Sequence, residues 1–118
     1  MTIKIGEALD LNMALISASN ISGSFKFSFA IGKNILKLKP ILKNFEDERQ
    51  VIIDSAKIEK IDNGFDFDSK PEAKEKLMEL LQQEIEVDLH TIKLDEEVQK
   101  LALSGAQIVG LDLILVEA

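Results

Sequence analysis

The chain has 118 residues, of which 46% are hydrophobic and 30% charged, and it contains no cysteine, tryptophan or tyrosine. This length and composition predict one domain over residues 1–118 with a hydrophobic core, and they exclude disulfides and thiolate metal sites. The net charge of −7 argues against general nucleic-acid binding, because phosphate groups repel an acidic surface.

The first 24 residues predict a short strand, a helix and a loop. Thr2 to Ile5 alternates polar and apolar residues, as a strand does, and Gly6 is expected to end it. The apolar residues that follow fit a buried helix over about residues 7–18. Residues 17–24 are rich in serine, glycine and asparagine, which favours a loop.

An apolar ladder is the strongest pattern, and it predicts a helix over about residues 25–58 with Ser24 as its N-cap. Its members recur at steps of three and four, with one gap: Ile31, Ile35, Leu38, Leu42, Phe45, Ile52 and Ala56. A strand over Phe25–Phe29 is the alternative for the first turns. Pro40 removes a backbone hydrogen bond, so we expect a kink near residues 36–40, with a break into two helices as the alternative.

A turn and a second helix follow. Asn63-Gly64 lies between apolar residues and favours a small β-hairpin within residues 57–68. Ser69 is placed to cap the next helix, and Pro71 falls in its first turn, where proline is favoured. This helix is expected to reach about Gln83.

The remaining chain predicts a strand and two further helices. Residues 85–91 alternate apolar and polar, which indicates a strand buried on one face, and the N-terminal strand is an available partner. Asp95 is placed to cap a short helix to Leu103. Ser104 has capping-box spacing ahead of an apolar run, which predicts a last helix, and a strand over residues 109–115 is the alternative.

Together these elements predict a mostly α fold of the α+β class. The long kinked helix and the helix over residues 70–83 form an antiparallel hairpin, with a small β-hairpin at its tip and a short two-strand element. The shorter helix can cover only about half of the ladder, since a helix grows by about 1.5 Å per residue. We therefore expect a second copy of the chain to cover the rest.

Charged residues on the long helix supply candidate binding sites. Residues 1–45 carry six lysines against two acidic residues, whereas residues 46–118 carry eight basic and nineteen acidic residues. The lysines fall on two stripes, the first with Lys26, Lys33 and Lys37 and the second with Lys39 and Lys43. Such a stripe could bind phosphate or an acidic partner, although a solvated helix face is the simpler interpretation.

Arg49, the one arginine, lies on the ladder between Phe45 and Ile52. A charge at such a position can fix an oligomer through a carboxylate of the 70–83 helix or of a second subunit. Alternatively, its side chain reaches water where the ladder leaves the core. We take Phe45, Arg49 and Ile52 as the candidate oligomer interface.

No pattern of residues indicates catalysis. His90, the one histidine, is predicted on the solvent face of its strand, without the partners that acid–base chemistry requires. There is no nucleophile elbow and no phosphate-binding glycine loop, and the acidic residues around Gly64 do not match the spacing of an EF-hand. We therefore predict no enzyme, no catalytic residue, no metal site and no cofactor.

Four segments together carry a resemblance over most of the chain: Ile5–Asn12, Gly32–Pro40 running into Phe45–Arg49, Glu84–Asp88 and Ser104–Asp112. In these segments the chain resembles a family of small uncharacterised proteins encoded by tailed phages and prophages. The family has no assigned reaction, so the resemblance implies a phage setting and no catalytic residues. Small acidic phage proteins serve in particle assembly or disable host defences, and both roles work by binding.

These observations lead to one main functional hypothesis. It is a non-enzymatic, phage-type binding protein that acts as a homo-oligomer, in virion assembly or by blocking a host factor. The alternative is an anti-defence protein that sequesters an anionic nucleotide signal, with its phosphates at Lys26, Lys33 and Lys37. The longest apolar run is too short to span a bilayer, and no signal-peptide pattern opens the chain, so we expect no membrane partner and a location in the host cytoplasm.

Overall fold

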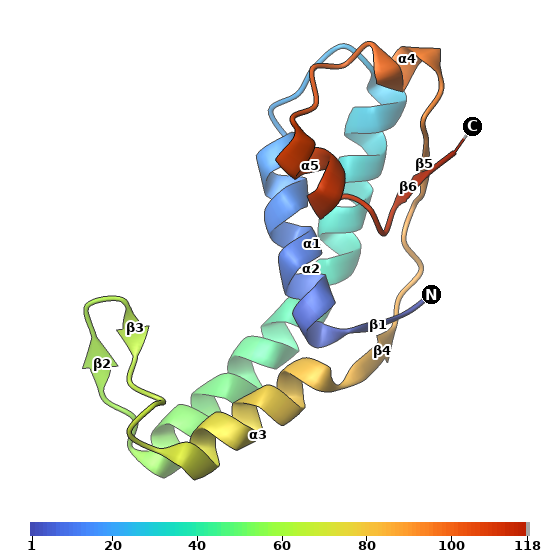
Figure 1. Ribbon diagram of the computed structural model, residues 1–118. Helices are drawn as coiled ribbons and strands as arrows, with labels where there is room; N and C mark the ends of the chain where they lie inside the picture. The colour runs from blue at the N-terminus through green and yellow to red at the C-terminus, as the bar shows by residue number, and fades with distance from the viewer. Residues whose placement is uncertain (118) are drawn as a thin grey trace.

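The computed structural model describes residues 1–117, which form a bent molecule built along one long helix (Figure 1). In chain order the elements are β1 (Thr2–Lys4), α1 (Ile5–Ala18), α2 (Phe25–Ala56), β2 (Lys60–Ile61), β3 (Gly64–Phe65), α3 (Pro71–Gln82), β4 (Glu84–Glu86), β5 (Ile92–Lys93), α4 (Glu96–Gln99), α5 (Gly105–Gly110) and β6 (Leu115–Val116). The predicted mostly α, α+β fold is therefore confirmed.

The long helix α2 runs unbroken through its proline. Ser24 caps it as predicted, since its hydroxyl oxygen accepts a hydrogen bond from the Phe27 N–H at 3.3 Å. Pro40 lies exposed within α2, where water can reach the carbonyl that it leaves unpaired. Figure 1 shows the helix axis changing direction between the part beside α1 and the part beside α3. A bend is present between these two parts, whereas the alternatives of two helices and of a strand over residues 25–29 are wrong.

Two helices, rather than one, cover the apolar ladder of α2. Leu11 and Leu15 of α1 share the main core with Ile31 and Leu38 in the upper half of α2. The lower half packs against α3, which runs antiparallel to it as predicted (Figure 1). The expectation that half of the ladder is left for a second copy is therefore wrong, because α1 covers that half within the chain.

The lower arm, formed by the second half of α2 with β2, β3 and α3, contains the predicted β-hairpin. Its register pairs Lys60 with Phe65 and Ile61 with Gly64, whose φ of +124° is a conformation that glycine adopts freely. Pro71 begins α3 as predicted. The predicted cap is wrong, because the Ser69 hydroxyl donates a hydrogen bond to a carboxylate oxygen of Asp66 at 2.6 Å instead.

The N-terminal strand pairs with the segment after α3. β1 and β4 are antiparallel, with Ile3 opposite Ile85. The predicted helix start at residue 7 is wrong, because α1 begins at Ile5 and Gly6 lies inside it. A glutamate explains the early start, since Glu7 accepts a hydrogen bond from the Lys4 N–H at 3.0 Å and so caps the first turn.

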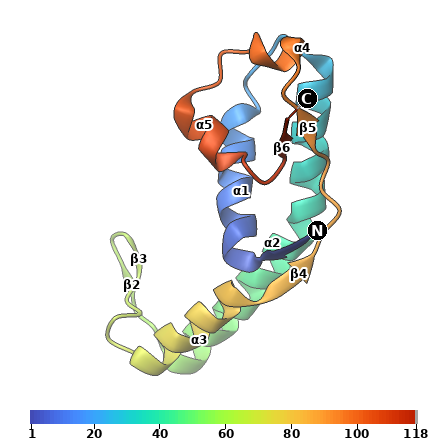
Figure 2. The ribbon, with the colours of Figure 1, turned by 45° about the vertical axis from the view of Figure 1, so that its right-hand side comes forward.

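The return segment, residues 84–95, runs back along α2 on the side away from α1 (Figure 2). Its predicted alternation holds as far as Leu89, because Val87 and Leu89 are buried while Asp88 is exposed. It is wrong beyond that point, since Thr91 is exposed and His90, predicted on the solvent face, is half-buried. The predicted strand over residues 85–91 is nevertheless too long, since its pairing with β1 ends at Glu86. Beyond that point the segment is held on α2 by other contacts, including those of a buried asparagine.

The C-terminal part contains the predicted helix, and the alternative strand over residues 109–115 is wrong, because α5 includes Val109 and β6 is limited to Leu115–Val116. Asp95 and Ser104 cap α4 and α5 as predicted, accepting backbone hydrogen bonds at 3.1 Å each. Both helices are shorter than expected, since α4 ends at Gln99 and α5 at Gly110. The chain then turns and forms β6, which pairs in parallel with β5.

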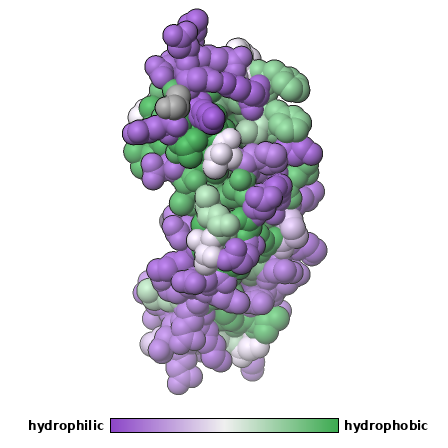
Figure 3. Space-filling model, turned by 90° about the vertical axis from the view of Figure 1, so that its right-hand side faces the viewer, coloured by the Kyte–Doolittle hydropathy of each residue, from purple (hydrophilic) through white to green (hydrophobic). Residues whose placement is uncertain are grey.

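The core is divided between an upper body and the lower arm. The main cluster joins α1, the upper half of α2, the return segment and the C-terminal part, while two smaller clusters hold the lower arm. The radius of gyration is 16.8 Å, whereas a compact domain of this length has about 13.5 Å. Figure 3 shows hydrophobic side chains reaching the surface in broken patches on the face of β4 and β5. The elongated shape leaves much of each helix at the surface.

Candidate functional site

The first lysine stripe of α2 is largely neutralised by the returning chain. Lys26 forms ion pairs with Asp95 and with Glu97, the latter at 3.5 Å. The ammonium nitrogen of Lys37 lies 3.4 Å from a carboxylate oxygen of Asp88. Two of the three lysines proposed to bind phosphate therefore already have anionic partners within the chain.

The third lysine, Lys33, lies beside exposed aromatic rings. Its ammonium nitrogen is 5.4 Å from the ring centroid of Phe29. Phe25, which is 83% exposed, has its ring centroid 5.9 Å from that of Phe29, and the His90 ring meets Phe29 edge-on at 6.1 Å. Exposed rings next to a cation can stack on a flat ligand. This aromatic surface was not among the predicted sites, although the i, i+4 spacing of the two phenylalanines is a pattern that places both rings on one helix face.

The three residues proposed as an oligomer interface have different environments. Phe45 is 6% exposed and packs with Ile5 and Leu80, so the chain itself covers it. Ile52 is partly buried between two core clusters of the lower arm. Arg49 is half-buried, and its guanidinium carbon lies 5.4 Å from the ring centroid of Phe65 in the β-hairpin.

Arg49 therefore does not pair as expected. Among residues 1–117 it has no ion pair with a carboxylate of α3 or of any other element. The ring of Phe65 instead offers the guanidinium a cation–π contact, which leaves part of the side chain in water. Two interpretations of Arg49 were given above, a carboxylate partner and a side chain that reaches water. The contact with Phe65 fits the second better than the first.

A first open groove lies between α1 and α2 and is called the upper groove. Its lining residues are Asn12 and Ile16 of α1 and Ile35, Leu36, Lys39, Leu42, Lys43 and Glu46 of α2. The floor is aliphatic, and Leu36 is 62% exposed although it is a large apolar residue. Both lysines of the second stripe belong to this groove, so the structure places that stripe beside exposed apolar surface.

A second open groove lies between α2 and α3 and is called the lower groove. It consists of two adjoining hollows that share Val51, Ile52 and Lys76. The other lining residues are Glu48, Ser55, Ala56, Glu72, Ala73, Glu79, Leu80, Gln82 and Gln83. Val51 is 63% exposed here, and no residue belongs to both the upper and the lower groove.

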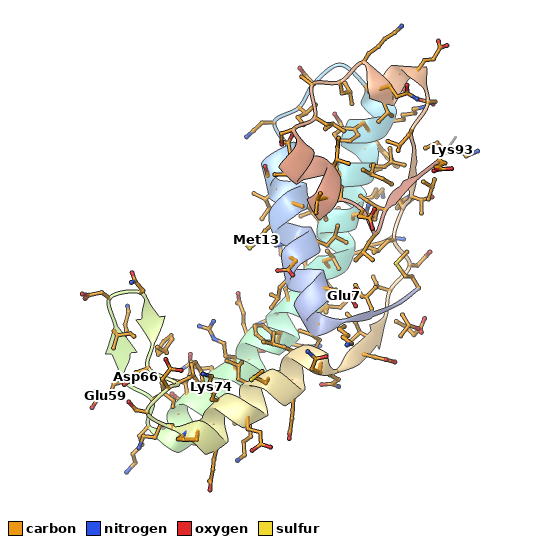
Figure 4. The ribbon with its side chains drawn as sticks, viewed as in Figure 1. Glu7, Met13, Glu59, Asp66, Lys74 and Lys93 are labelled. Atoms are coloured by element: carbon orange, nitrogen blue, oxygen red, sulfur yellow. The ribbon has the colours of Figure 1, made fainter. Side chains whose placement is uncertain are left out.

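Two acidic residues near the β-hairpin bind neighbouring side chains of the lower arm. Asp66 binds Ser69, and Asp68 pairs with Lys74 at 2.7 Å. Figure 4 shows Asp66 and Lys74 close together where the hairpin and α3 meet. The hydrogen bond and the charge of Lys74 lower the pKa of Asp68. Within residues 1–117, no three acidic or histidine side chains are grouped so that they could hold a metal ion.

Comparison of the chain with protein-family models, with curated proteins and with solved structures finds no match. In the part of the chain that the structure describes, no helix combines the length and the apolar content needed to cross a bilayer. The two grooves and the aromatic end of α2 are therefore the features from which a function must be argued.

Proposed function

We propose that this chain is a non-enzymatic binding protein that acts as a homo-oligomer, in a phage setting where it serves particle assembly or blocks a host protein. One observation carries the proposal: large aliphatic side chains line both grooves at more than half exposure, with Leu36 in the upper groove and Val51 in the lower. Apolar side chains gathered in grooves with charged rims are typical of surfaces that bind other proteins.

The energy of such a contact favours use of both grooves. Completing the burial of a half-exposed aliphatic side chain stabilises a complex by about 1–2 kcal/mol. Association of two chains costs about 4–15 kcal/mol in translational and rotational entropy, and the contacts must offset this cost. The few apolar side chains of one groove cannot offset that cost alone, whereas a contact that joins two grooves roughly doubles the buried apolar area.

Sedimentation velocity of the full chain over a range of micromolar concentrations tests the proposal. The mass should rise above the 13.1 kDa of a single chain as concentration increases. Leu36→Asp and Val51→Asp should each lower the association, since a charge would then enter an apolar contact. Met78→Asp is the matched control, because Met78 is 56% exposed on α3 but lines neither groove. A mass of 13.1 kDa at every concentration would contradict the proposal.

A second candidate function, capture of an anionic nucleotide, has support from the aromatic end of α2. A base could stack on the exposed rings of Phe25 and Phe29, and its phosphate could meet Lys33, the lysine of the first stripe that lacks an ion pair within residues 1–117. In this mode of binding Lys33 is the one lysine of the first stripe that contacts the phosphate, since Lys26 and Lys37 have carboxylate partners.

Isothermal titration calorimetry with cyclic nucleotides and ADP-ribose-type nucleotides tests the second candidate. Binding should be weakened by Phe29→Ala and by Lys33→Ala, which remove the stacking ring and the cation. Lys93→Ala is the control, because Lys93 is an exposed lysine on β5 (Figure 4) that makes no cation–π contact with a ring of residues 1–117. Absence of heat with all of these nucleotides would remove this candidate.

A further inference from the structure

The two grooves have opposite charges on their rims. The upper groove has Lys39 and Lys43 with one glutamate, Glu46. The lower groove has three glutamates, Glu48, Glu72 and Glu79, with one lysine, Lys76. Each groove also has an aliphatic floor. The surfaces are therefore complementary to each other in charge and similar in apolar character.

The charges of both rims are available to a partner. Lys39 of the upper groove and Glu48 and Glu79 of the lower groove have no ion pair within residues 1–117. Lys43 pairs only with Asp47 one turn along α2, at 3.6 Å and with both side chains well exposed. Such an exposed pair contributes little, so it competes weakly with a partner carboxylate.

We propose that a second copy of this chain occupies the upper groove and presents its own lower groove to it. The inference rests on the proposed self-association and specifies which surfaces of the two copies meet. Lysines of one copy then face glutamates of the next, while the apolar floors meet between them. Contact between two upper grooves would instead bring lysines together, and contact between two lower grooves would bring glutamates together, so each like pair is disfavoured.

This geometry makes the assembly head-to-tail. Each copy uses its upper groove toward one neighbour and its lower groove toward another, because the two surfaces share no residue. A contact between unlike surfaces does not stop at a dimer; it produces a ring when the rotation closes and a filament when it does not. Raised salt should weaken the association, since exposed charges take part.

A charge-swap experiment tests the proposal. The upper-groove variant carries Lys39→Glu and Lys43→Glu, and the lower-groove variant carries Glu48→Lys and Glu79→Lys. Each variant alone places like charges across the contact, so its self-association should weaken at least about tenfold. An equimolar mixture should regain association, because each variant then offers the groove that complements the other. Far-UV circular dichroism of each variant confirms that its helices are retained.

The outcomes separate this geometry from self-association in general. If the parent chain is a monomer at all concentrations, the proposed function fails and this inference fails with it. If the parent associates but only one variant weakens, like grooves meet and the head-to-tail contact is wrong. If both variants lose self-association and their equimolar mixture does not regain it, the proposal is also overturned. Binding of an oligonucleotide that is lost in the upper-groove variant, with a monomeric parent, would assign that groove to nucleic acid instead.

Discussion

Replacement of Asn34 tests how the return segment is held on the long helix. The Asn34 side chain is fully buried, at 0% exposure, in the upper half of α2. Its carbonyl oxygen accepts the His90 N–H at 2.7 Å, and its amide nitrogen donates to the His90 carbonyl at 2.9 Å. The asparagine thus makes the two hydrogen bonds that a residue of a neighbouring antiparallel strand would make, at a point where the segment has left β1.

Asn34→Ala should lower the free energy of unfolding by about 2–4 kcal/mol. Each hydrogen bond that is removed takes away about 0.5–1.5 kcal/mol, and a buried backbone group left unpaired costs about 1–3 kcal/mol. His90 is half-buried, so water can restore part of this loss. The better helix propensity of alanine returns about 0.5 kcal/mol. At this chain length the melting temperature should fall by roughly 8–15 °C.

Equilibrium urea unfolding followed by circular dichroism measures this change. The matched control is Asn44→Ala, since Asn44 is exposed on the same helix, and it should raise stability by about 0.5 kcal/mol through the helix propensity of alanine alone. Hydrogen exchange should show the His90 amide protected in the parent and unprotected in Asn34→Ala. Equal stabilities of the two alanine variants would refute the argument that the asparagine holds the segment.

Asn34→Asp gives a test with a pH dependence. A protonated carboxyl could keep both contacts to His90, donating to its carbonyl and accepting its N–H, whereas an ionised carboxylate would face that carbonyl with a buried negative charge. The pKa of the new carboxyl should therefore be raised in the folded state. A raised pKa gives stability that is present at acid pH and lost as the pH rises through it. In urea unfolding, the stability of Asn34→Asp should be closer to that of the parent at mildly acidic pH than at neutral pH. A stability difference that is the same at both pH values would contradict the reasoning.

Three further predictions concern the lower arm and the packing of α5 on α1. Arg49→Leu and Arg49→Glu should each change stability by less than about 1 kcal/mol, because each substitution removes only a cation–π interaction with Phe65, and thermal melting of both variants beside the parent checks this. Gly110→Ala should cost about 1–3 kcal/mol in urea unfolding, since its methyl group would lie 2.7 Å from a side-chain carbon of α1. NMR titration should find the pKa of Asp68 below its ordinary value and find it raised in Lys74→Gln; the ionised Asp68 favours the folded state, so its contribution is lost as the pH falls through that lowered pKa.

The local elements were predictable because their signals lie within a few residues of one another. The apolar ladder indicated α2, and Ser24 marked its start by a hydrogen bond that reaches only three residues along the chain. Asn63-Gly64 marked the hairpin, and Pro71 the start of α3. Alternation predicted the burial of Val87 and Leu89 in the return segment, since that depends on the period of an extended chain, but it failed at Thr91, which is exposed.

Tertiary structure decided the features that depend on distant residues. Asn34 and His90 are 56 positions apart, so no local pattern could show that a polar side chain would be buried and satisfied there. Lys26 and Asp95 are 69 positions apart, and only the path of the return segment shows that two of the three lysines of the first stripe have carboxylate partners within the chain. The sequence by itself determined which helices form; the packing of α1 and of the return segment on α2 determined which of their charged and apolar side chains remain at the surface. The physical reason is that burial is a property of the whole folded chain, whereas helix formation depends mainly on neighbours three and four residues away.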